Sequence, residues 1–274
     1  MTAREDWQGK TGEGWAAEWK RTDRSFGGLT EHLLARSRDF RFRHSLDVGC
    51  GAGELSLALA RGRPQARIIG VDVSPALIAA ARKRAERMFN VEFRLADAAQ
   101  WQPDDDFAPQ LLISRHGVMF FADPSAAFAN LAKLAAPRAA LLFSCFRDRR
   151  ENPFFSTIGA LLPLPAETPD PHAPGPFAFA DRDRVASILR EGGWRDIAFE
   201  PFDFAMIAGA GDDPVEDAMG YFQRIGPAAA AIREMDAASR ARVLDSIREV
   251  LRDNCSEGVV AMRAATWIVT ARRS

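Results

Sequence analysis

One stretch, Leu46-Asp47-Val48-Gly49-Cys50-Gly51-Ala52-Gly53-Glu54-Leu55, constrains the fold of this chain more than any other. It has the pattern of a buried strand that ends in a glycine turn and continues directly into a helix. Three glycines at alternate positions leave the strand tip without side chains, so a ligand can lie against bare backbone and the free N–H groups of the helix. The stretch therefore predicts a nucleotide-type site at the first β-α turn of a parallel sheet.

Downstream of this turn, short apolar runs alternate with helical patterns, which is typical of parallel β-α units. Ser74-Pro75 and Asp123-Pro124 each combine an N-cap residue with proline at the first helical position, so a helix is expected to begin at each. The predicted fold class is α/β, with a Rossmann-like, seven-stranded, mostly parallel sheet, helices on both faces, an antiparallel last strand, and a helical cap from the N-terminus and inserts. The expected strands are 45–48, 67–71, 91–95, 110–114, 139–146, 197–207 and 259–270.

Interruptions of this pattern divide the chain into three expected regions. Residues 1–44 precede the first strand and are expected to form an N-terminal helical lid, broken at Gly27-Gly28. Residues 45–208 and 259–274 are expected to form the core, which includes a proline-rich connection at 147–180 typical of a functional loop. Residues 209–258 have helical spacing and are expected to form an insert that caps the substrate.

Charge and composition exclude several classes of function. Lys and Arg total 36 against 37 Asp and Glu, so no overall field attracts nucleic acid or acidic lipid. No apolar run approaches the roughly 18–20 residues of a membrane span, and the segment 1–10 lacks the apolar core of a secretion signal. Cys50, Cys145 and Cys255 are widely spaced and form neither a disulfide framework nor a metal motif. We therefore expect a cytoplasmic monomer or homodimer without metal, nucleic-acid or membrane partners.

Residues around the glycine turn discriminate between nucleotide ligands. Glu54 stands where the dinucleotide pattern G-x-G-x-x-G requires its third glycine. Asp47, beside the turn, would oppose a pyrophosphate and suits a ligand with a positive charge, such as an amino group or a sulfonium. Asp72 lies at the tip of the next predicted strand, where an acid meets a ribose hydroxyl, and it disfavours a 2′-phosphate. These residues favour a nucleoside that carries an amino acid over a dinucleotide.

Four motifs in this chain resemble those of class I S-adenosylmethionine-dependent methyltransferases, in the family's order and spacing and over residues 45–146. They are Leu46-Asp47-Val48-Gly49-Cys50-Gly51-Ala52-Gly53, Gly70-Val71-Asp72-Val73-Ser74, Leu95-Ala96-Asp97-Ala98 and Leu111-Leu112-Ile113-Ser114. A further run, Val118-Met119-Phe120-Phe121-Ala122-Asp123-Pro124, is similar to a subgroup of small-molecule methyltransferases near the quinone-biosynthesis type. The resemblance implies S-adenosylmethionine as the cofactor and methyl transfer as the reaction.

The same resemblance implies roles for residues at the predicted cofactor site. The glycines would line the methionine and ribose part, and Asp72 would accept hydrogen bonds from the ribose hydroxyls. Val73 would pack on adenine, and Asp97 with the Ala98 backbone would meet its amino group. The residues after the fourth strand would face the methyl donor. The implied cofactor-binding residues are Asp47, Gly49, Cys50, Gly51, Gly53, Asp72, Val73, Asp97, Ala98, Ser114 and Arg115.

The acceptor side is less constrained by the sequence. Methyl transfer from a sulfonium is an in-line displacement in which the protein mainly aligns the reactants and excludes water. After the fourth strand the chain reads Ser114-Arg115-His116-Gly117, without the Asn- or Asp-Pro-Pro-aromatic tetrapeptide of enzymes that methylate nucleic-acid amino groups. His116 is a candidate catalytic base or substrate contact, or alternatively a histidine that shapes the pocket. Trp19 and Tyr221 are candidate substrate contacts, with packing as the alternative for each.

Three functions stay open at this point. The first is methyl transfer to a small molecule, with oxygen as the acceptor atom and with segments 147–180 and 209–258 as the acceptor lid. Apolar residues of the first segment, among them Phe154, Phe155 and Phe177, predict an apolar acceptor, and a peptide acceptor stays open. The second is a nicotinamide-dependent oxidoreductase, against which the missing third glycine argues. The third is a non-catalytic, methyltransferase-like regulator that binds the cofactor.

Overall fold

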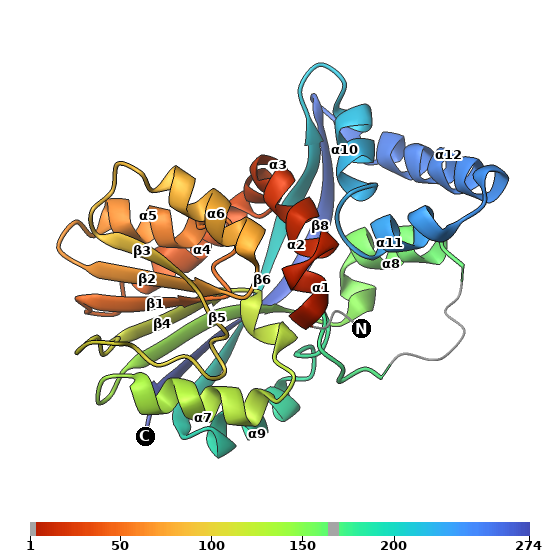
Figure 1. Cartoon of the computed structure of the whole chain (residues 1–274). Helices are drawn as coiled ribbons and strands as arrows, with labels where there is room; N and C mark the ends of the chain where they lie inside the picture. The colour runs from red at the N-terminus through yellow and green to blue at the C-terminus, as the bar shows by residue number, and fades with distance from the viewer. Residues whose placement is uncertain (1–3, 164–169) are drawn as a thin grey trace.

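The strands assemble into one eight-stranded sheet with the main order β3-β2-β1-β4-β5-β8-β6 (Figure 1). The computed structural model describes residues 4–163 and 170–274 of the chain. The first five strands pair in parallel, and β8 runs antiparallel between β5 and β6. The strands are β1 (His44–Val48), β2 (Arg67–Asp72), β3 (Val91–Leu95), β4 (Leu111–Arg115), β5 (Ala140–Phe146), β6 (Trp194–Ala210), β7 (Cys255–Ser256) and β8 (Val259–Arg273).

The strand count corrects the prediction of seven strands. The additional strand, β7, has two residues and pairs with the start of β8 through Cys255↔Val260 and Ser256↔Val259. Glu257 and Gly258 between them both have positive φ, as a two-residue hairpin turn requires. A strand this short leaves no periodic pattern in a sequence. The predicted α/β class, with a mostly parallel sheet and an antiparallel last strand, is confirmed.

Helices cover both faces of the sheet (Figure 1). Both predicted cap-plus-proline starts are confirmed, because Leu77 N–H donates to Ser74 Oγ and Ala126 N–H donates to Asp123 Oδ1. The helix that begins at Pro75 ends at Arg84. One face carries α4 (Gly27–Ser37), α5 (Glu54–Gly62) and α6 (Pro75–Arg84), and the other carries α7 (Pro124–Leu134) and α9 (Arg182–Glu191).

The strand order locates the site. All residues of β5 are buried, since both faces of the sheet are covered, and such strands have continuous apolar sequences. The carboxyl ends of β1, β2 and β4 lie at one edge because these strands are parallel. The chain reverses its progress across the sheet between β1 and β4. Open α/β sheets bind ligands at such a switch point.

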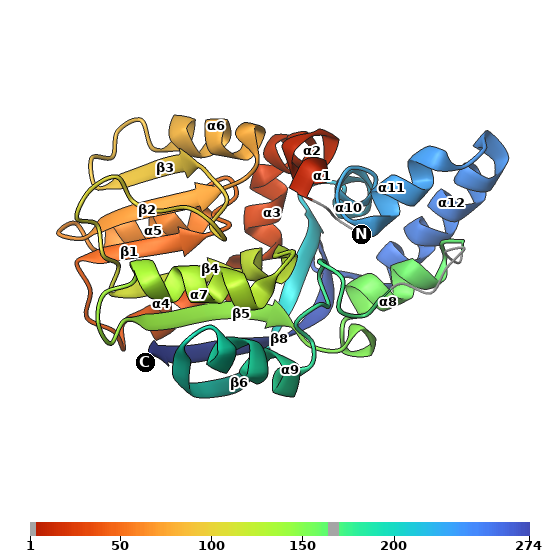
Figure 2. The same cartoon turned by 60° about the horizontal axis from the view of Figure 1, so that its bottom comes forward.

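The N-terminal segment forms three short helices, α1 (Arg4–Gln8), α2 (Lys10–Ala17) and α3 (Trp19–Ser25), before α4. Figure 2 shows α1 and α2 between α6 and α10 (Pro214–Phe222), beyond the carboxyl ends of the strands. The expected break at Gly27-Gly28 matches a boundary between helices, because α3 ends at Ser25, Phe26 separates the two helices, and these glycines open α4. A helix start tolerates glycine better than a helix interior does.

The late strands carry the helical insert. β6 and β8 are 17 and 15 residues long, and they continue past the sheet to α10, α11 (Pro227–Glu234) and α12 (Ala237–Asp253) (Figure 1). The connection 147–180 contains α8 (Pro153–Ala160), which packs against α11 and α12. Residues 164–169 of that predicted loop lie outside the described residues. Within the described ranges, no helix has the length and apolar character to cross a membrane.

Candidate cofactor and acceptor site

The glycine turn after β1 has the open backbone predicted for it. Gly49, Gly51 and Gly53 have φ values of 66°, 55° and 88°, a region that residues with a Cβ rarely adopt. A Cβ on Gly49 would lie 2.7 Å from the Cα of Gly117, and one on Gly53 would lie 2.7 Å from the Phe93 ring. A Cβ on Gly51 would meet no atom within 4 Å. Gly49 and Gly53 therefore allow the turn to pack, whereas Gly51 faces space that a ligand can fill.

Asp72, at the end of β2, holds the turn in place. One of its carboxylate oxygens accepts a hydrogen bond from Gly51 N–H and the other accepts from Ser74 N–H, each at 2.9 Å. A carboxylate oxygen can accept more than one hydrogen bond, so Asp72 can also accept from ribose hydroxyls. Burial raises the pKa of Asp72, and the backbone hydrogen bonds oppose that rise.

Asp47 is enclosed beneath the turn. Its side chain is 1% exposed, and it accepts a hydrogen bond from Ser56 Oγ at 2.6 Å. Burial raises the pKa of Asp47 to about 6, although the Ser56 hydrogen bond and the charge of Arg115 oppose the rise. Asp47 can therefore favour a bound cation through its charge, without an exposed surface of its own.

Ser114 and Gly117 bind the tip of β4 to the tip of β1. Ser114 Oγ donates to Val48 O at 2.7 Å and accepts from Gly117 N–H at 3.0 Å. Gly117 approaches Gly49 so closely that neither has room for a Cβ. Ser114 thus fixes the turn, and these contacts hold Arg115 and His116 at the edge of the sheet.

Arg84, on α6, connects the N-terminal segment to the glycine turn. It donates to Ala52 O at 2.8 Å, and it pairs with Glu54 at 2.5 Å and with Asp23 of α3 at 2.7 Å. Its guanidinium carbon lies 3.9 Å from the centre of the Trp19 ring, a cation–π contact. One cation therefore holds α3 over the turn that is predicted to bind the cofactor.

Asp23 and Glu54 share this cation and also contact each other. Burial raises the pKa of Asp23 to about 6, with Glu54 adding to the rise and the charges of Arg115 and Arg84 opposing it. Burial also acts to raise the pKa of Glu54, but the hydrogen bond from Asp23 and the charge of Arg84 lower it overall. Below about pH 6, Asp23 is therefore the protonated partner that donates to Glu54.

The N-terminal segment also reaches the opposite side of the site. The Trp7 ring packs edge-on against Phe120, in the turn after β4, with 5.1 Å between ring centres, and it lies 5.7 Å from Trp15. On the α6 side, Gly12 packs directly on Ser74 with no room for a Cβ. The segment thus contacts both sides of the sheet edge and covers it.

His116, after β4, has an unusual backbone and an unpaired nitrogen. Its φ is 66°, and its ring stacks on Phe146 at 4.1 Å and meets Phe26 edge-on at 5.5 Å. Nδ1 lies 3.3 Å from Ser144 O, while Nε2 is buried without a hydrogen-bond partner in the described part of the chain. Burial, together with the charge of Arg115, lowers the pKa of His116 to about 3, so the ring is neutral.

Arg115 is fixed by neighbours from the N-terminal segment. It donates to Thr30 Oγ1 at 2.7 Å, lies 3.8 Å from the Asp23 carboxylate, and stacks over Phe26 at 5.5 Å. Its side chain is 15% exposed. Its charge acts on the site, but most of its surface is already covered by these contacts.

The edge predicted to bind adenine lies at the tips of β2 and β3. Asp97 accepts a hydrogen bond from Ala99 N–H at 2.9 Å, and Ala98 is buried. Val73 is half-buried after β2. The Cys50 side chain packs into a small apolar cluster that includes Phe93. The predicted cofactor residues thus come from adjacent strand tips.

The two candidate substrate contacts from helices are Tyr221 of α10 and Trp19 of α3. Tyr221 is 1% exposed, and its ring neighbours are Phe154 and Phe222. Trp19 lies on Arg84, at the glycine turn. Roles of Trp19 and Tyr221 toward a substrate stay predictions.

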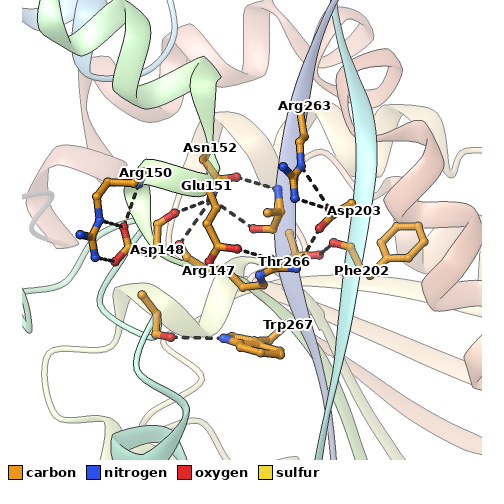
Figure 3. Close-up of polar contacts among 12 residues, drawn as sticks. Arg147, Asp148, Arg150, Glu151, Asn152, Phe202, Asp203, Arg263, Thr266 and Trp267 are labelled. Atoms are coloured by element: carbon orange, nitrogen blue, oxygen red, sulfur yellow. Dashed lines mark hydrogen bonds and ion pairs between the residues drawn. The ribbon is translucent and has the colours of Figure 1, made fainter.

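The segment after β5 is hydrogen-bonded to β8 (Figure 3). Asn152 is fully buried; it donates to Asp148 O and Ala265 O and accepts from Ala265 N–H at 2.8 Å. Arg147 pairs with Asp203 of β6 at 2.8 Å. This network fixes the start of α8 against the sheet, next to the end of β5.

These residues fit S-adenosylmethionine. The open backbone at Gly51 and the carboxylate of Asp72 suit a ribose at the strand tips. The carboxylate of Asp47 suits a donor with a positive sulfonium and amino group and would repel a pyrophosphate, whereas Asp23 and Glu54 are paired with Arg84. The structure thus agrees with the expectation from the missing third glycine.

Comparison with known proteins identifies the family. A family model described as a methyltransferase domain matches residues 46–138. Trans-aconitate 2-methyltransferase from Paracidovorax citrulli is 31% identical over 221 residues, covering 75% of this chain and 82% of the relative. The protein of the same name from Variovorax paradoxus is 32% identical over 167 residues, covering 61% of this chain and 60% of the relative. The chain belongs to the class I S-adenosylmethionine-dependent methyltransferases.

Solved structures share the fold. YcgJ from Bacillus subtilis aligns with a TM-score of 0.56 at 15% identity, over 90% of this chain and 98% of that one. Phosphoethanolamine N-methyltransferase 2 from Haemonchus contortus, solved with S-adenosylhomocysteine, aligns with a TM-score of 0.56 at 15% identity, over 95% of this chain and 56% of that one. The protein is therefore a methyltransferase enzyme with S-adenosylmethionine as its cofactor, and the oxidoreductase and regulator alternatives are set aside.

Several residues that shape the site were not found by sequence reasoning. Arg84 and Asp23 look like solvated helix positions in the sequence, yet they form the contact between α3 and the glycine turn. Ser56 pairs with Asp47 nine positions away, and its signal was a hydroxyl on the otherwise apolar inner face of a helix. Phe146, the stacking partner of His116, has the appearance of an ordinary core residue.

Proposed function

We propose that this enzyme transfers the methyl group of S-adenosylmethionine to an oxygen atom of a small-molecule acceptor that lies beside His116. The observation that carries the proposal is the buried Nε2 of His116, which has no partner in the described ranges. Buried polar atoms are normally paired, so an unpaired one at the tip of β4, next to the cofactor turn, indicates a ligand position.

S-adenosylmethionine supplies an activated methyl group that its sulfur releases as a neutral thioether forms. In the proposal, Gly51 and Asp72 hold the ribose, and Val73 and Asp97 hold the adenine. The remaining predicted cofactor residues act by shaping the turn or by charge. The N-terminal helices cover the edge of the sheet, and exclusion of water strengthens each charge interaction inside.

The division into three regions belongs to the same proposal. Residues 1–44 act as the lid, 45–208 with 259–274 as the core, and 209–258 as the cap on the acceptor side. Support comes from the aromatic contacts that lead away from His116. The centre of the Phe146 ring lies 5.2 Å from that of Phe155 and 5.9 Å from that of Phe177, and both of these residues belong to the connection after β5. This side suits an apolar acceptor.

The relatives supply a second candidate for the acceptor group. Those from Paracidovorax citrulli and Variovorax paradoxus are named trans-aconitate 2-methyltransferases. For this chain, the corresponding reaction would be methylation of a carboxylate oxygen, with an ester as the product. Both candidates have an oxygen atom as the methyl acceptor. They differ in the charge of the acceptor group and in the product.

Transfer of radiolabel tests the proposal directly. The protein is incubated with S-adenosylmethionine labelled in the methyl group, once with a metabolite extract and once with trans-aconitate. We expect labelled ethers or esters, and loss of labelling in Asp72→Ala. The folded state of that variant is checked by circular dichroism. Absence of labelled product with every extract, or label found in amines alone, would refute oxygen methylation.

A further inference from the structure

We propose that the acceptor presents an uncharged hydroxyl on an apolar body, rather than a carboxylate, to Nε2 of His116. The inference rests on the proposed function and narrows its substrate class. An acceptor of this kind would distinguish this enzyme from a methyltransferase that acts on a tricarboxylate. Three features carry it: the protonation pattern of the imidazole, the rings around it, and the charges beside it.

The first feature is the tautomer of His116. Nδ1 lies 3.3 Å from both the backbone oxygen and the Oγ of Ser144, and a carbonyl oxygen can only accept a hydrogen bond. In the proposal Nδ1 donates to this carbonyl oxygen, and the neutral ring then has a lone pair on Nε2. The low pKa of His116 agrees with a neutral ring. A group that pairs with Nε2 must donate a hydrogen bond, which a hydroxyl does and an ionised carboxylate does not.

The second feature is the apolar environment of the imidazole. Phe146 stacks on one face of the ring and Phe26 meets it edge-on. The rings continue from Phe146 to Phe155 and Phe177. Moving an ionised carboxylate into such surroundings is costly unless a cation pairs with it. An apolar body with one hydroxyl gains from the same surroundings.

The third feature is the balance of nearby charge. Arg115, the cation beside His116, is already engaged by Thr30, Asp23 and the Phe26 ring. The enclosed Asp47 adds a negative charge at the turn. A tricarboxylate would therefore meet acids, a lone pair and a cation that is already occupied.

The same geometry gives His116 a place in the reaction. As the acceptor oxygen forms its bond to the methyl carbon, the carbon–sulfur bond breaks and its electron pair stays on sulfur. The hydroxyl proton moves to Nε2, which leaves a neutral ether and an imidazolium. An imidazole with a pKa of about 3 can take this proton because an alkylated hydroxyl is a far stronger acid than a free one. The imidazolium then returns the proton to water when the products leave.

Binding of three matched probes tests the inference without turnover. The protein, saturated with S-adenosylhomocysteine, is titrated with 4-ethylphenol, ethylbenzene and 4-ethylbenzoate by calorimetry. We expect the phenol to bind about 10- to 100-fold more tightly than ethylbenzene, since the hydroxyl satisfies a buried acceptor. The benzoate should bind more weakly than the phenol.

Two variants at one position provide the control. In His116→Asn, the amide can still donate toward Ser144 O, and asparagine tolerates the positive φ, but no atom reaches the Nε2 position. The phenol preference should fall to within about threefold of unity. His116→Gln can place an amide oxygen near that position and should retain part of the preference. Thermal unfolding shows that each variant is folded before it is titrated.

The outcomes separate this inference from the proposed function. A phenol preference that persists in His116→Asn, a benzoate that binds more tightly than the phenol, or no binding of any probe overturns the inference. Labelled products that release methanol in base are esters, which would overturn the inference while oxygen methylation stands. A preference for the phenol without any labelled product would support this inference and would refute the proposed oxygen methylation.

Discussion

Replacement of Asp47 by asparagine should stabilise the fold at neutral pH and weaken cofactor binding. Asp47 is 1% exposed, with its carboxylate bonded to Ser56 Oγ. Burial raises its pKa from an ordinary value of 3.8 to about 6. Between these two pH values, the folded protein holds a proton that the unfolded chain has released, so ionisation of Asp47 opposes folding.

The size and sign of the effect follow from proton linkage. A carboxyl group whose pKa is raised by folding contributes its full stability below its unfolded pKa, and that stability is lost as pH rises through the folded pKa. A shift of about two pH units corresponds to about 3 kcal/mol in the free energy of unfolding. Asparagine does not titrate. The stability difference between Asp47→Asn and wild type should therefore move in favour of the variant by about 2–3 kcal/mol from pH 4 to pH 7.

Urea unfolding at pH 4, 5, 6 and 7 measures this difference. Asp106→Asn, which changes an exposed carboxylate in a loop, is the matched control and should show no such trend. In binding, Asp47→Asn should lose more affinity for S-adenosylmethionine than for S-adenosylhomocysteine, because the first alone carries a sulfonium charge. A stability difference that stays flat with pH would show that Asp47 is not the titrating group.

Four further variants probe the turn and the lid. Gly51→Ala should cost only about 1–2 kcal/mol of stability, since its φ is positive but its Cβ has space. Calorimetry should show that this variant binds S-adenosylhomocysteine at least tenfold more weakly. Gly49→Ala, which clashes with Gly117, should lose more than about 3 kcal/mol of stability in urea unfolding. Arg84→Met should destabilise the protein by about 3 kcal/mol, because two acids lose their partner, and unchanged unfolding would contradict the role given to Arg84. Hydrogen exchange of α3, corrected for intrinsic rates, should accelerate several-fold from pH 5 to pH 7 as Asp23 ionises, and Asp23→Asn should remove that dependence.

The cofactor half of the fold could be predicted because its signals are local. The third strand was placed at 91–95, as the structure has it, because a short alternation of apolar and charged residues between turns favours a strand. Asp72 and the glycines belong to one β-α-β unit, in which sequence order dictates position in space. The same holds for the N-caps Ser74 and Asp123, whose partners lie three residues onward.

The contacts of the lid could not be predicted because they connect distant positions. Arg84 meets Asp23 across 61 positions and Glu54 across 30, and no local pattern encodes such pairs. His116 was singled out by its place after the fourth strand, whereas the identity of its free nitrogen depends on Ser144, in a strand further along.

The two long strands that carry the insert bring its ends together. Ala210, the last residue of β6, pairs with Val259, the first of β8, so the chain leaves and re-enters the sheet one strand spacing apart. The entropy of closing a loop grows only slowly with its length. The intervening segment could therefore be shortened, enlarged or exchanged for an unrelated sequence while the strand ends stay in register. This hairpin therefore makes the surface above the site open to replacement by engineering, whereas the glycine turn, at the end of the interior strand β1, has no room for larger residues at Gly49 and Gly53.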